Sequence, residues 1–444
     1  MNGLTGARVV IVDDEEKEAI PVIREFSKRG VPSVYYKDVN DLPTSDAEKL
    51  LGVRLAVLDL DLIGGAVSEK SMVSTLLGYL RKVLRSDNGP YGILIWTKHV
   101  NVRELFEEEI FGVPDIPNPV FIVCISKYDC KNKKGDFKIK KVASEISKAL
   151  DGFSPLLLLQ KWEETSFLSA TQVTNQLANL STREAANLDE WRNLWKTEFL
   201  QLMHAMAAAE AGQQLNIDKV LGSLYGAMNP LLTDRMESNV ASLRKPSSAH
   251  SAEILASKPT ENEQAKIKLN TMLLLAFDGV NDFYAGNIYM KSKLGASIPS
   301  VGKILDDFVA GNSPNARTQN KSELAPLSKS VAVEINAACD HSQNHIQNAR
   351  MLVGLLVPKD KHKKIKGSVE FIYKLGPVFL DIKEISAGEY YFYFSARHLV
   401  TIELKHVLDV RPFARLRGQT FGDLQAWFAR QSTRPGMLTL RINN

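Results

Sequence analysis

The sequence has few cysteines and no long hydrophobic run. Only Cys124, Cys130 and Cys339 occur among its 444 residues. A sparse, odd-numbered set of cysteines does not build a disulfide framework and is typical of proteins from a reducing compartment. No apolar run approaches the roughly 18 residues that a membrane-spanning helix needs, and the N-terminus lacks the basic and apolar regions of a secretory signal. We therefore expect a cytoplasmic protein with no membrane partner.

The composition shows no extreme of any kind. Hydrophobic residues make up 44%, charged residues 24% and aromatic residues 8% of the chain, which excludes disordered, collagen-like and coiled-coil classes. At roughly 150 residues per domain, the length allows about three domains. Residues 350–444 contain 16 Lys and Arg against 8 Asp and Glu, so an acidic partner is expected to bind there rather than elsewhere.

The first 150 residues alternate short β-branched apolar runs with amphipathic segments. This rhythm is typical of a parallel sheet that is covered by helices on both faces. We predict strands at 8–12, 33–36, 54–60, 91–96 and 120–125. We predict helices at 15–28, 46–51, 68–84, 102–111 and 138–150. The fold class is therefore α/β, with an N-terminal doubly wound five-stranded parallel sheet, and function is expected at the carboxyl ends of the strands.

Polar side chains that could bind a metal or take part in a reaction stand at four of these strand ends. They are Asp13, Asp14, Asp59, Asp61, Thr97 and Lys127. Because the carboxyl ends of parallel strands emerge at one edge of a sheet, we expect these side chains to converge. Clustered carboxylates raise one another's pKa unless a cation neutralises them, and oxygen ligands suit Mg²⁺. A carboxylate beside a metal, with an ammonium and a hydroxyl nearby, is the arrangement that forms an aspartyl phosphate.

The strand ends that carry these residues have the sequences VVIVDDE, AVLDLDL, ILIWT and FIVCISK, in that order along the chain. In these motifs and their order, about residues 6–150 resemble the receiver domain of bacterial two-component response regulators. The resemblance implies a phosphorelay in which a cognate histidine kinase donates a phosphoryl group, with Mg²⁺ as cofactor. It also implies that Asp59 is the phosphorylated nucleophile. Asp14, Asp59 and the backbone carbonyl of Asp61 would ligate the ion, and Asp13 would hold a metal-bound water.

The same resemblance assigns roles to Lys127 and Thr97. Lys127 would pair first with the acceptor carboxylate and then with the phosphoryl group, and Thr97 would hydrogen-bond a phosphoryl oxygen. The chain departs from the family at Cys124, where an aromatic switch residue is usual, and at Lys98, where a small side chain is common. We predict that Lys98 pairs with Asp61 across the mouth of the site; the alternative is that both are solvated loop charges.

Beyond residue 151 the pattern changes to long helices and then to strands. Helices are predicted at 155–178, 182–211 and 216–240, the second of them opened by a capping box of Ser181 and Glu184. Residues 242–264 are predicted to be a linker. The predicted domains are a receiver-like domain at 1–150, a helical domain at 151–284 and a β-rich domain at 285–444. The last is expected to form a small barrel or a strongly bent sheet, closed by a helix at 419–431.

Two features of the C-terminal region allow more than one interpretation. If their segment is helical, His341 and His345 share a face beside Cys339 and could bind Zn²⁺, and Cys339 could be a nucleophile. No second ligand pair is evident, and a structural turn with a packed cysteine is the favoured interpretation. The basic run at 359–366 could contact phosphates, but a solvated charge cluster is the commoner explanation.

We therefore predict a phosphoacceptor signalling protein with no separate enzymatic output. Its layout is similar to the buffer component of Detocs-type phage-defence systems, which implies a phosphate buffer between a kinase and a separate effector protein. Two alternatives remain open at this point. One is a phosphorylation-controlled regulator that binds nucleic acid through the basic C-terminal region. The other is a receiver-like scaffold that is never phosphorylated.

Overall fold

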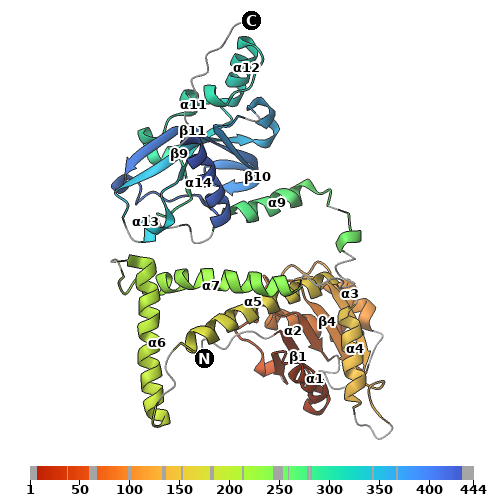
Figure 1. Ribbon diagram of the computed structural model, residues 1–444. Coiled ribbons are helices and arrows are strands. Elements are labelled where there is room, and N and C mark those ends of the chain that lie inside the picture. The colour runs from red at the N-terminus through yellow and green to blue at the C-terminus, as the bar shows by residue number, and fades with distance from the viewer. Residues whose placement is uncertain are drawn as a thin grey trace. The chain divides into compact units, whose positions relative to one another are not determined.

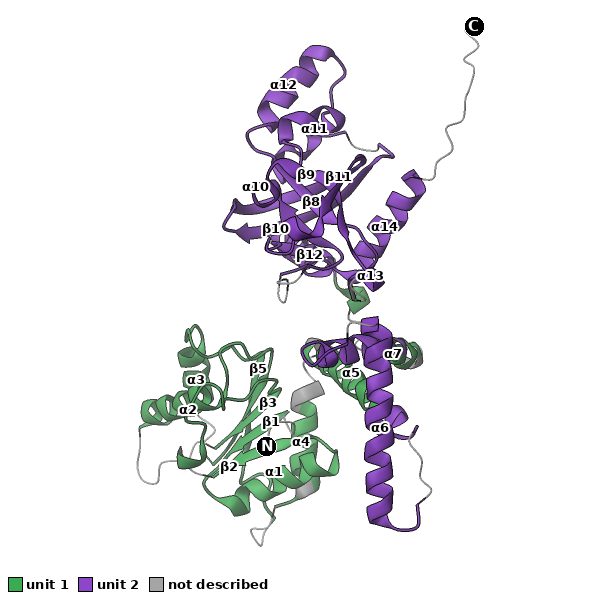
Figure 2. Cartoon of the chain, turned by 90° about the vertical axis from the view of Figure 1, so that its left-hand side faces the viewer, with its two compact units in different colours: residues 1–174, 235–257 green, residues 175–234, 258–444 purple. Residues whose placement is uncertain are grey.

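The structure, a computed structural model, describes most of residues 8–432. It leaves out 38, 60–67, 99–101, 133–136, 152–153, 181–184, 213–214, 244–253, 259, 278–279, 281–282, 343–344 and 367–368. The chain divides into two compact units, residues 1–174 with 235–257 and residues 175–234 with 258–444 (Figure 2). The predicted domain boundaries near residues 150 and 284 stay predictions. Within the described ranges, every helix is too short or too polar to cross a membrane.

The first unit is built on a five-stranded parallel sheet (Figure 1). Its strands are β1 (Val9–Val12), β2 (Ser33–Tyr36), β3 (Leu55–Leu58), β4 (Gly92–Thr97) and β5 (Phe121–Ser126). They lie in the order β2-β1-β3-β4-β5, and each neighbouring pair is parallel. This is the flavodoxin-like order of doubly wound folds. The five predicted strands and the predicted class of this sheet are confirmed.

Helices pack on both faces of this sheet. They are α1 (Glu16–Lys28), α2 (Glu69–Val83), α3 (Arg103–Ile110) and α4 (Ile139–Asp151). Successive strand residues point to opposite faces, so Val10 lies in the hydrophobic cluster of Phe106 on α3, whereas Ile11 lies in that of Val22 on α1. Because both faces are buried there, the inner strands β1 and β3 are apolar at every position.

One predicted helix of this unit is wrong. Residues 46–51 form a turn that ends in an isolated bridge between Leu50 and Leu84. Six residues are too few to offset the unfavourable nucleation of a helix without strong packing. The crossover between β2 and β3 is therefore mostly irregular, with a short 3₁₀ turn at Val39–Asp41.

Three long helices follow α4. They are α5 (Ser154–Ala178), α6 (Leu188–Ala211) and α7 (Val220–Leu243). Glu163 on α5 accepts hydrogen bonds from Arg8 Nη1 at 2.8 Å and Arg54 Nε at 3.1 Å, which ties α5 to the amino ends of β1 and β3. On α7, the Asn239 amide donates to Ser169 Oγ of α5 at 2.8 Å.

Helix α6 begins later than the predicted residue 182. Its N-cap is Asn187, whose side chain accepts from the Glu190 backbone N–H at 2.9 Å, while the Glu190 carboxylate accepts from the Ala186 N–H at 2.9 Å. These bonds satisfy backbone donors that a helix start otherwise leaves open. The predicted capping residues Ser181 and Glu184 lie outside the described residues.

The second unit contains a seven-stranded antiparallel sheet in the order β10-β11-β9-β8-β7-β12-β6. Its strands are β6 (Leu275–Ala276), β7 (Asn287–Met290), β8 (Lys329–Glu334), β9 (Asn348–Pro358), β10 (Ile372–Ile382), β11 (Ile385–Glu403) and β12 (Ala414–Leu416). Among the described strands, β10 and β6 are the edges. The sheet is therefore curled but open, which matches the prediction of a strongly bent sheet rather than a closed barrel.

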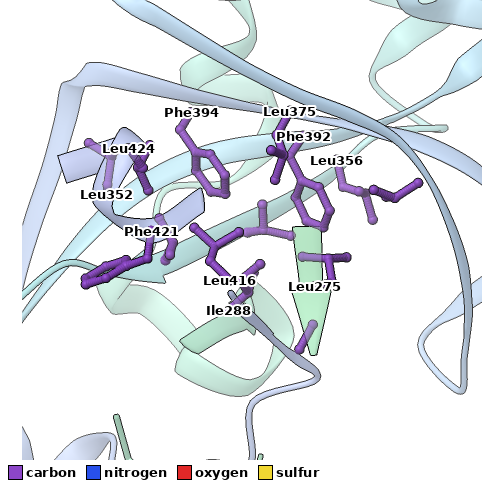
Figure 3. Close-up of a cluster of buried hydrophobic side chains, with 14 of the residues drawn as sticks. Leu275, Ile288, Leu352, Leu356, Leu375, Phe392, Phe394, Leu416, Phe421 and Leu424 are labelled. Atoms are coloured by element: carbon purple, nitrogen blue, oxygen red, sulfur yellow. The ribbon is translucent and has the colours of Figure 1, made fainter. Parts of the chain in front are cut away.

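Helices border this sheet on both faces. They are α9 (Glu263–Leu274), α10 (Lys291–Leu294), α11 (Val301–Phe308), α12 (Pro314–Leu324), α13 (Ala338–Ser342) and α14 (Gly418–Ser432). Leu424 of α14 packs in one core with Phe392 and Phe394 of β11 (Figure 3). The predicted closing helix is confirmed. On the other face, Leu305 and Phe308 of α11 belong to a second cluster.

The close pairing of β9 with β11 gives a stability prediction. A Cβ on Gly354 would lie 2.3 Å from the backbone oxygen of Tyr393, so the strands must separate to admit it. We expect Gly354→Ala to lower the free energy of unfolding of the second unit by about 1–3 kcal/mol in urea denaturation. Gly302→Ala on α11 is the control, because a Cβ there meets nothing within 4 Å. Equal denaturation midpoints for both variants would contradict the prediction.

Candidate functional site

The sheet brings the ends of four parallel strands together. The Asp59 N–H donates to the carbonyl of Val12 at 2.9 Å, so the residue after β3 lies beside the residue after β1, Asp13. The Lys127 N–H donates to the carbonyl of Thr97 at 2.8 Å, which places the end of β5 beside the end of β4. Backbone hydrogen bonds between the strands therefore place the predicted residues side by side, independently of any contact between their side chains.

Three of the predicted carboxylates form one cluster. Asp13, Asp14 and Asp59 each offer an oxygen, and these three atoms lie within 4.8 Å of one another. Asp13 and Asp59 are each 1% exposed, whereas Asp14 is exposed. In the part of the chain that the structure describes, this is the one group of three or more acidic, His or Cys side chains with such spacing. Asp61, also predicted here, lies outside the described residues.

Lys127 is buried at the centre of the cluster. Its Nζ donates to Asp13 Oδ2 at 3.0 Å, to Glu18 Oε2 at 2.7 Å and to Asp59 Oδ2 at 2.7 Å. An ammonium has three N–H bonds, and each has an acceptor here. Burial would lower the pKa of Lys127, but the surrounding carboxylates outweigh that effect and raise it above its usual range. The side chain therefore stays charged although it is 0% exposed.

Glu18 is a member of this cluster that the sequence reasoning missed. It lies in the first turn of α1 and is 4% exposed. Besides Lys127, its carboxylate accepts from Lys131 Nζ at 2.8 Å and lies 3.4 Å from Lys98 Nζ. Burial would raise the pKa of Glu18, but the bonds from Lys127 and Lys131 outweigh it and lower the pKa to about 2. The available signal was its spacing of four residues from the buried Val22, which places it on the core-facing stripe.

The cluster holds more negative charge than Lys127 neutralises. Burial, opposed by Lys127 and helped by nearby Asp59, raises the pKa of Asp13 to about 7. The other oxygen of Asp13, Oδ1, accepts from the Glu15 backbone N–H at 2.9 Å. A group of closely spaced carboxylate oxygens with an exposed member is the donor set that a hard divalent cation prefers. The buried acidic cluster thus resembles the Mg²⁺ site of a receiver, and its residues fit that ion.

Thr97 and Lys98 border the cluster at the end of β4. Thr97 is 0% exposed and lies opposite Ser126 of β5 in the sheet register. Lys98 Nζ lies 3.4 Å from a carboxylate oxygen of Glu15 and 3.4 Å from one of Glu18. Its predicted pairing with Asp61 stays a prediction, because Asp61 is outside the described residues.

The Cys and His residues of the second unit do not form a metal site within the described residues. His341 Nε2 lies 2.7 Å from Glu334 Oε2, and the His341 ring packs 4.8 Å from the Phe283 ring. Cys339 and His345 are both exposed. The structural interpretation of this segment is therefore the better supported one.

The basic run at 359–366 lies on a 3₁₀ helix, Lys359–Lys364, and the turn after it. Its lysines have local partners: Lys359 lies 2.8 Å from Glu263 and 2.9 Å from Glu389, and Lys364 pairs with Glu323. These carboxylates offset much of the charge that phosphates would need, which favours the interpretation as a surface charge cluster. A nucleic-acid partner stays a prediction.

Comparison with known proteins adds little to this geometry. The sequence matches no protein-family model and no curated protein. Full-length FixJ from B. japonicum is 14% identical over 53% of this chain and 98% of its own, with a TM-score of 0.22. A de novo designed Rossmann 2x3 fold protein is 13% identical over 32% of this chain and 90% of its own, with a TM-score of 0.20. The receiver-like character of the first unit therefore rests on its strand order and on the strand-end cluster.

The raised pKa of Asp13 predicts a stability effect that depends on pH. The folded state binds the Asp13 proton up to about pH 7, whereas the unfolded chain releases it near 3.8, so ionised Asp13 destabilises the fold increasingly from pH 4 to 7. We expect Asp13→Asn to raise the free energy of unfolding above pH 7, by about 4 kcal/mol at most. The gain should vanish near pH 4.

Urea denaturation at both pH values, in the presence of a chelator, measures this difference. Asp46→Asn is the control, because the Asp46 side chain is 91% exposed. The prediction is wrong if Asp13→Asn is destabilising at pH 8, or if its effect is the same at pH 8 and pH 4.

Proposed function

We propose that the first unit is a phosphoacceptor, which takes a phosphoryl group from a phosphohistidine of a histidine kinase onto Asp59. The observation that supports this most is the position of Asp59, buried at a strand end with Lys127 Nζ 2.7 Å from its Oδ2 and two further aspartates within 4.8 Å. In the transfer, an oxygen of Asp59 forms a P–O bond while the P–N bond of the donor breaks. The leaving imidazole nitrogen takes up a proton.

The residues around Asp59 have distinct tasks in this proposal. Lys127 stays cationic and offsets the charge that develops on the phosphoryl oxygens. Thr97, at the neighbouring strand end, would hydrogen-bond one of these oxygens. Asp13, Asp14 and Asp59 would hold Mg²⁺, which when bound neutralises negative charge on the phosphoryl oxygens and the carboxylates. The cluster is open to solvent at the exposed Asp14. Asp13 and Asp59 are buried, which limits the entry of water to their side of the cluster.

The remainder of the chain would transmit or store the signal. We assign no separate enzymatic step to residues 151–444, and we propose that they hold a partner such as a separate effector. In a cytoplasmic phosphorelay, a receiver-like unit without an output enzyme can act as a phosphate buffer, and phage defence is the setting that the layout favours. The described cysteines form no disulfide with one another, which is compatible with a reducing compartment.

A phosphodonor assay tests the proposal. We expect the full chain to gain the mass of one phosphoryl group when incubated with acetyl phosphate and Mg²⁺, and a chelator to prevent the gain. Intact mass spectrometry detects the product, and reductive trapping of the acyl phosphate followed by peptide mapping locates it. Asp59→Asn should abolish the gain, whereas Asp46→Asn, an exposed substitution, should leave it unchanged.

The outcomes separate the proposal from its rivals. If the mass gain is absent from the wild-type chain, the phosphoacceptor function is wrong and the scaffold interpretation is favoured. If the gain persists in Asp59→Asn, another side chain is the acceptor and the assignment of Asp59 is wrong.

A further inference from the structure

The buried carboxylate of Glu18 has no task in the phosphoacceptor proposal, on which the inference below rests. It comes from a helix rather than from a strand end, and its side chain is 6% exposed. Three ammonium groups approach it: Lys127 at 2.7 Å, Lys131 at 2.8 Å and Lys98 at 3.4 Å. A buried charge with this number of opposite partners fixes their positions strongly, because each partner left alone would be costly.

Glu18 directly affects the lysine that a phosphoryl group would need. All three N–H bonds of Lys127 are directed at carboxylates, to Asp13, Glu18 and Asp59. A phosphoryl group on Asp59 can contact Lys127 only by accepting the N–H that Lys127 now donates to Asp59. Glu18 keeps its own hydrogen bond to the same nitrogen. Two anionic groups would then share one ammonium at close range, and like charges so placed repel.

The charges of the site show the same competition. Among the described residues, the carboxylates of this region are those of Asp13, Asp14, Glu15, Glu18 and Asp59, and the ammonium groups are those of Lys98, Lys127 and Lys131. When all of these described groups are ionised, they carry about two negative charges in excess, which one divalent cation balances. A phosphoryl group adds a further negative charge to this balanced state. Without the charge of Glu18, the site with its divalent cation would have about one positive charge in excess, and the phosphoryl group would then neutralise it.

We propose that Glu18 is a positioning residue that holds Lys127 and biases the site toward a divalent cation and against the phosphoryl group. The carboxylate draws part of the charge of Lys127 away from Asp13 and Asp59, which leaves their oxygens more available to a cation. The same carboxylate weakens the hold of Lys127 on a phosphoryl oxygen. Glu18 therefore acts on the two ligands in opposite directions.

Glu18→Gln in the full chain tests this role, because glutamine keeps the shape and can still accept from Lys127. Titration calorimetry with MgCl₂ gives the affinity for the cation. Titration with beryllofluoride, a phosphoryl analogue, at saturating Mg²⁺ gives the affinity for the anion. We expect Mg²⁺ to bind about fivefold more weakly and beryllofluoride to bind about tenfold more tightly than to the wild type. A merely structural defect would weaken both.

Two further variants act as controls. Glu25→Gln changes another buried glutamate of α1, 7% exposed and paired with Arg29 at 2.8 Å, and should alter neither affinity. Glu18→Asp restores the charge and should return both affinities toward the wild-type values. Circular dichroism melting checks that each variant is folded.

The results distinguish this inference from the proposed function. If wild type and Glu18→Gln bind beryllofluoride equally well, or if the variant loses affinity for both ligands, the role of Glu18 is wrong while the phosphoacceptor function stands. If neither chain binds beryllofluoride and neither is phosphorylated, the phosphoacceptor function itself is wrong.

Discussion

The ammonium of Lys127 among three buried carboxylates is the interaction on which the first unit depends. Lys127 is 0% exposed, and Asp13, Glu18 and Asp59 surround its nitrogen at 2.7–3.0 Å. Removing Lys127 from this set would leave its buried carboxylates uncompensated, which typically costs about 3–5 kcal/mol. The carboxylates could not stay this close without the lysine, and the lysine could not be buried without them. The same set of charged contacts therefore stabilises the fold and positions the groups of the site.

The proposed chemistry lies in the first unit. The parallel sheet brings a carboxylate, an ammonium and a hydroxyl to one edge through backbone pairing alone. In the second unit the polar groups that looked reactive in the sequence are paired with neighbours, as His341 is with Glu334 and Lys359 with Glu263 and Glu389. Its apolar cores lie between the sheet and the helices that border it.

The sequence alone predicted the elements whose signals are local. The apolar strands of the first sheet and the residues at their ends could be read because a parallel sheet aligns its carboxyl ends. Glu18 was missed because its role depends on lysines more than 75 residues away. Strand β10 continues through Gly376 and Pro377, residues that typically end a strand, because the interruption between Leu375 and Val378 is a register shift within the ladder. The helices α10, α11 and α12 were missed since they are short and owe their stability to tertiary packing.

The ionisation of Lys127 tests the account most directly. Heteronuclear NMR of the full chain, labelled with ¹⁵N at lysine, follows the Nζ resonance of Lys127 as the pH rises, with Lys127→Met providing the assignment. The account predicts that this ammonium keeps its protons, protected from exchange, well above the pH of about 10.4 at which ordinary lysines titrate. Titration of Lys127 at or below that pH, or rapid exchange of its protons with solvent, would show that the carboxylates do not hold it and would contradict the account.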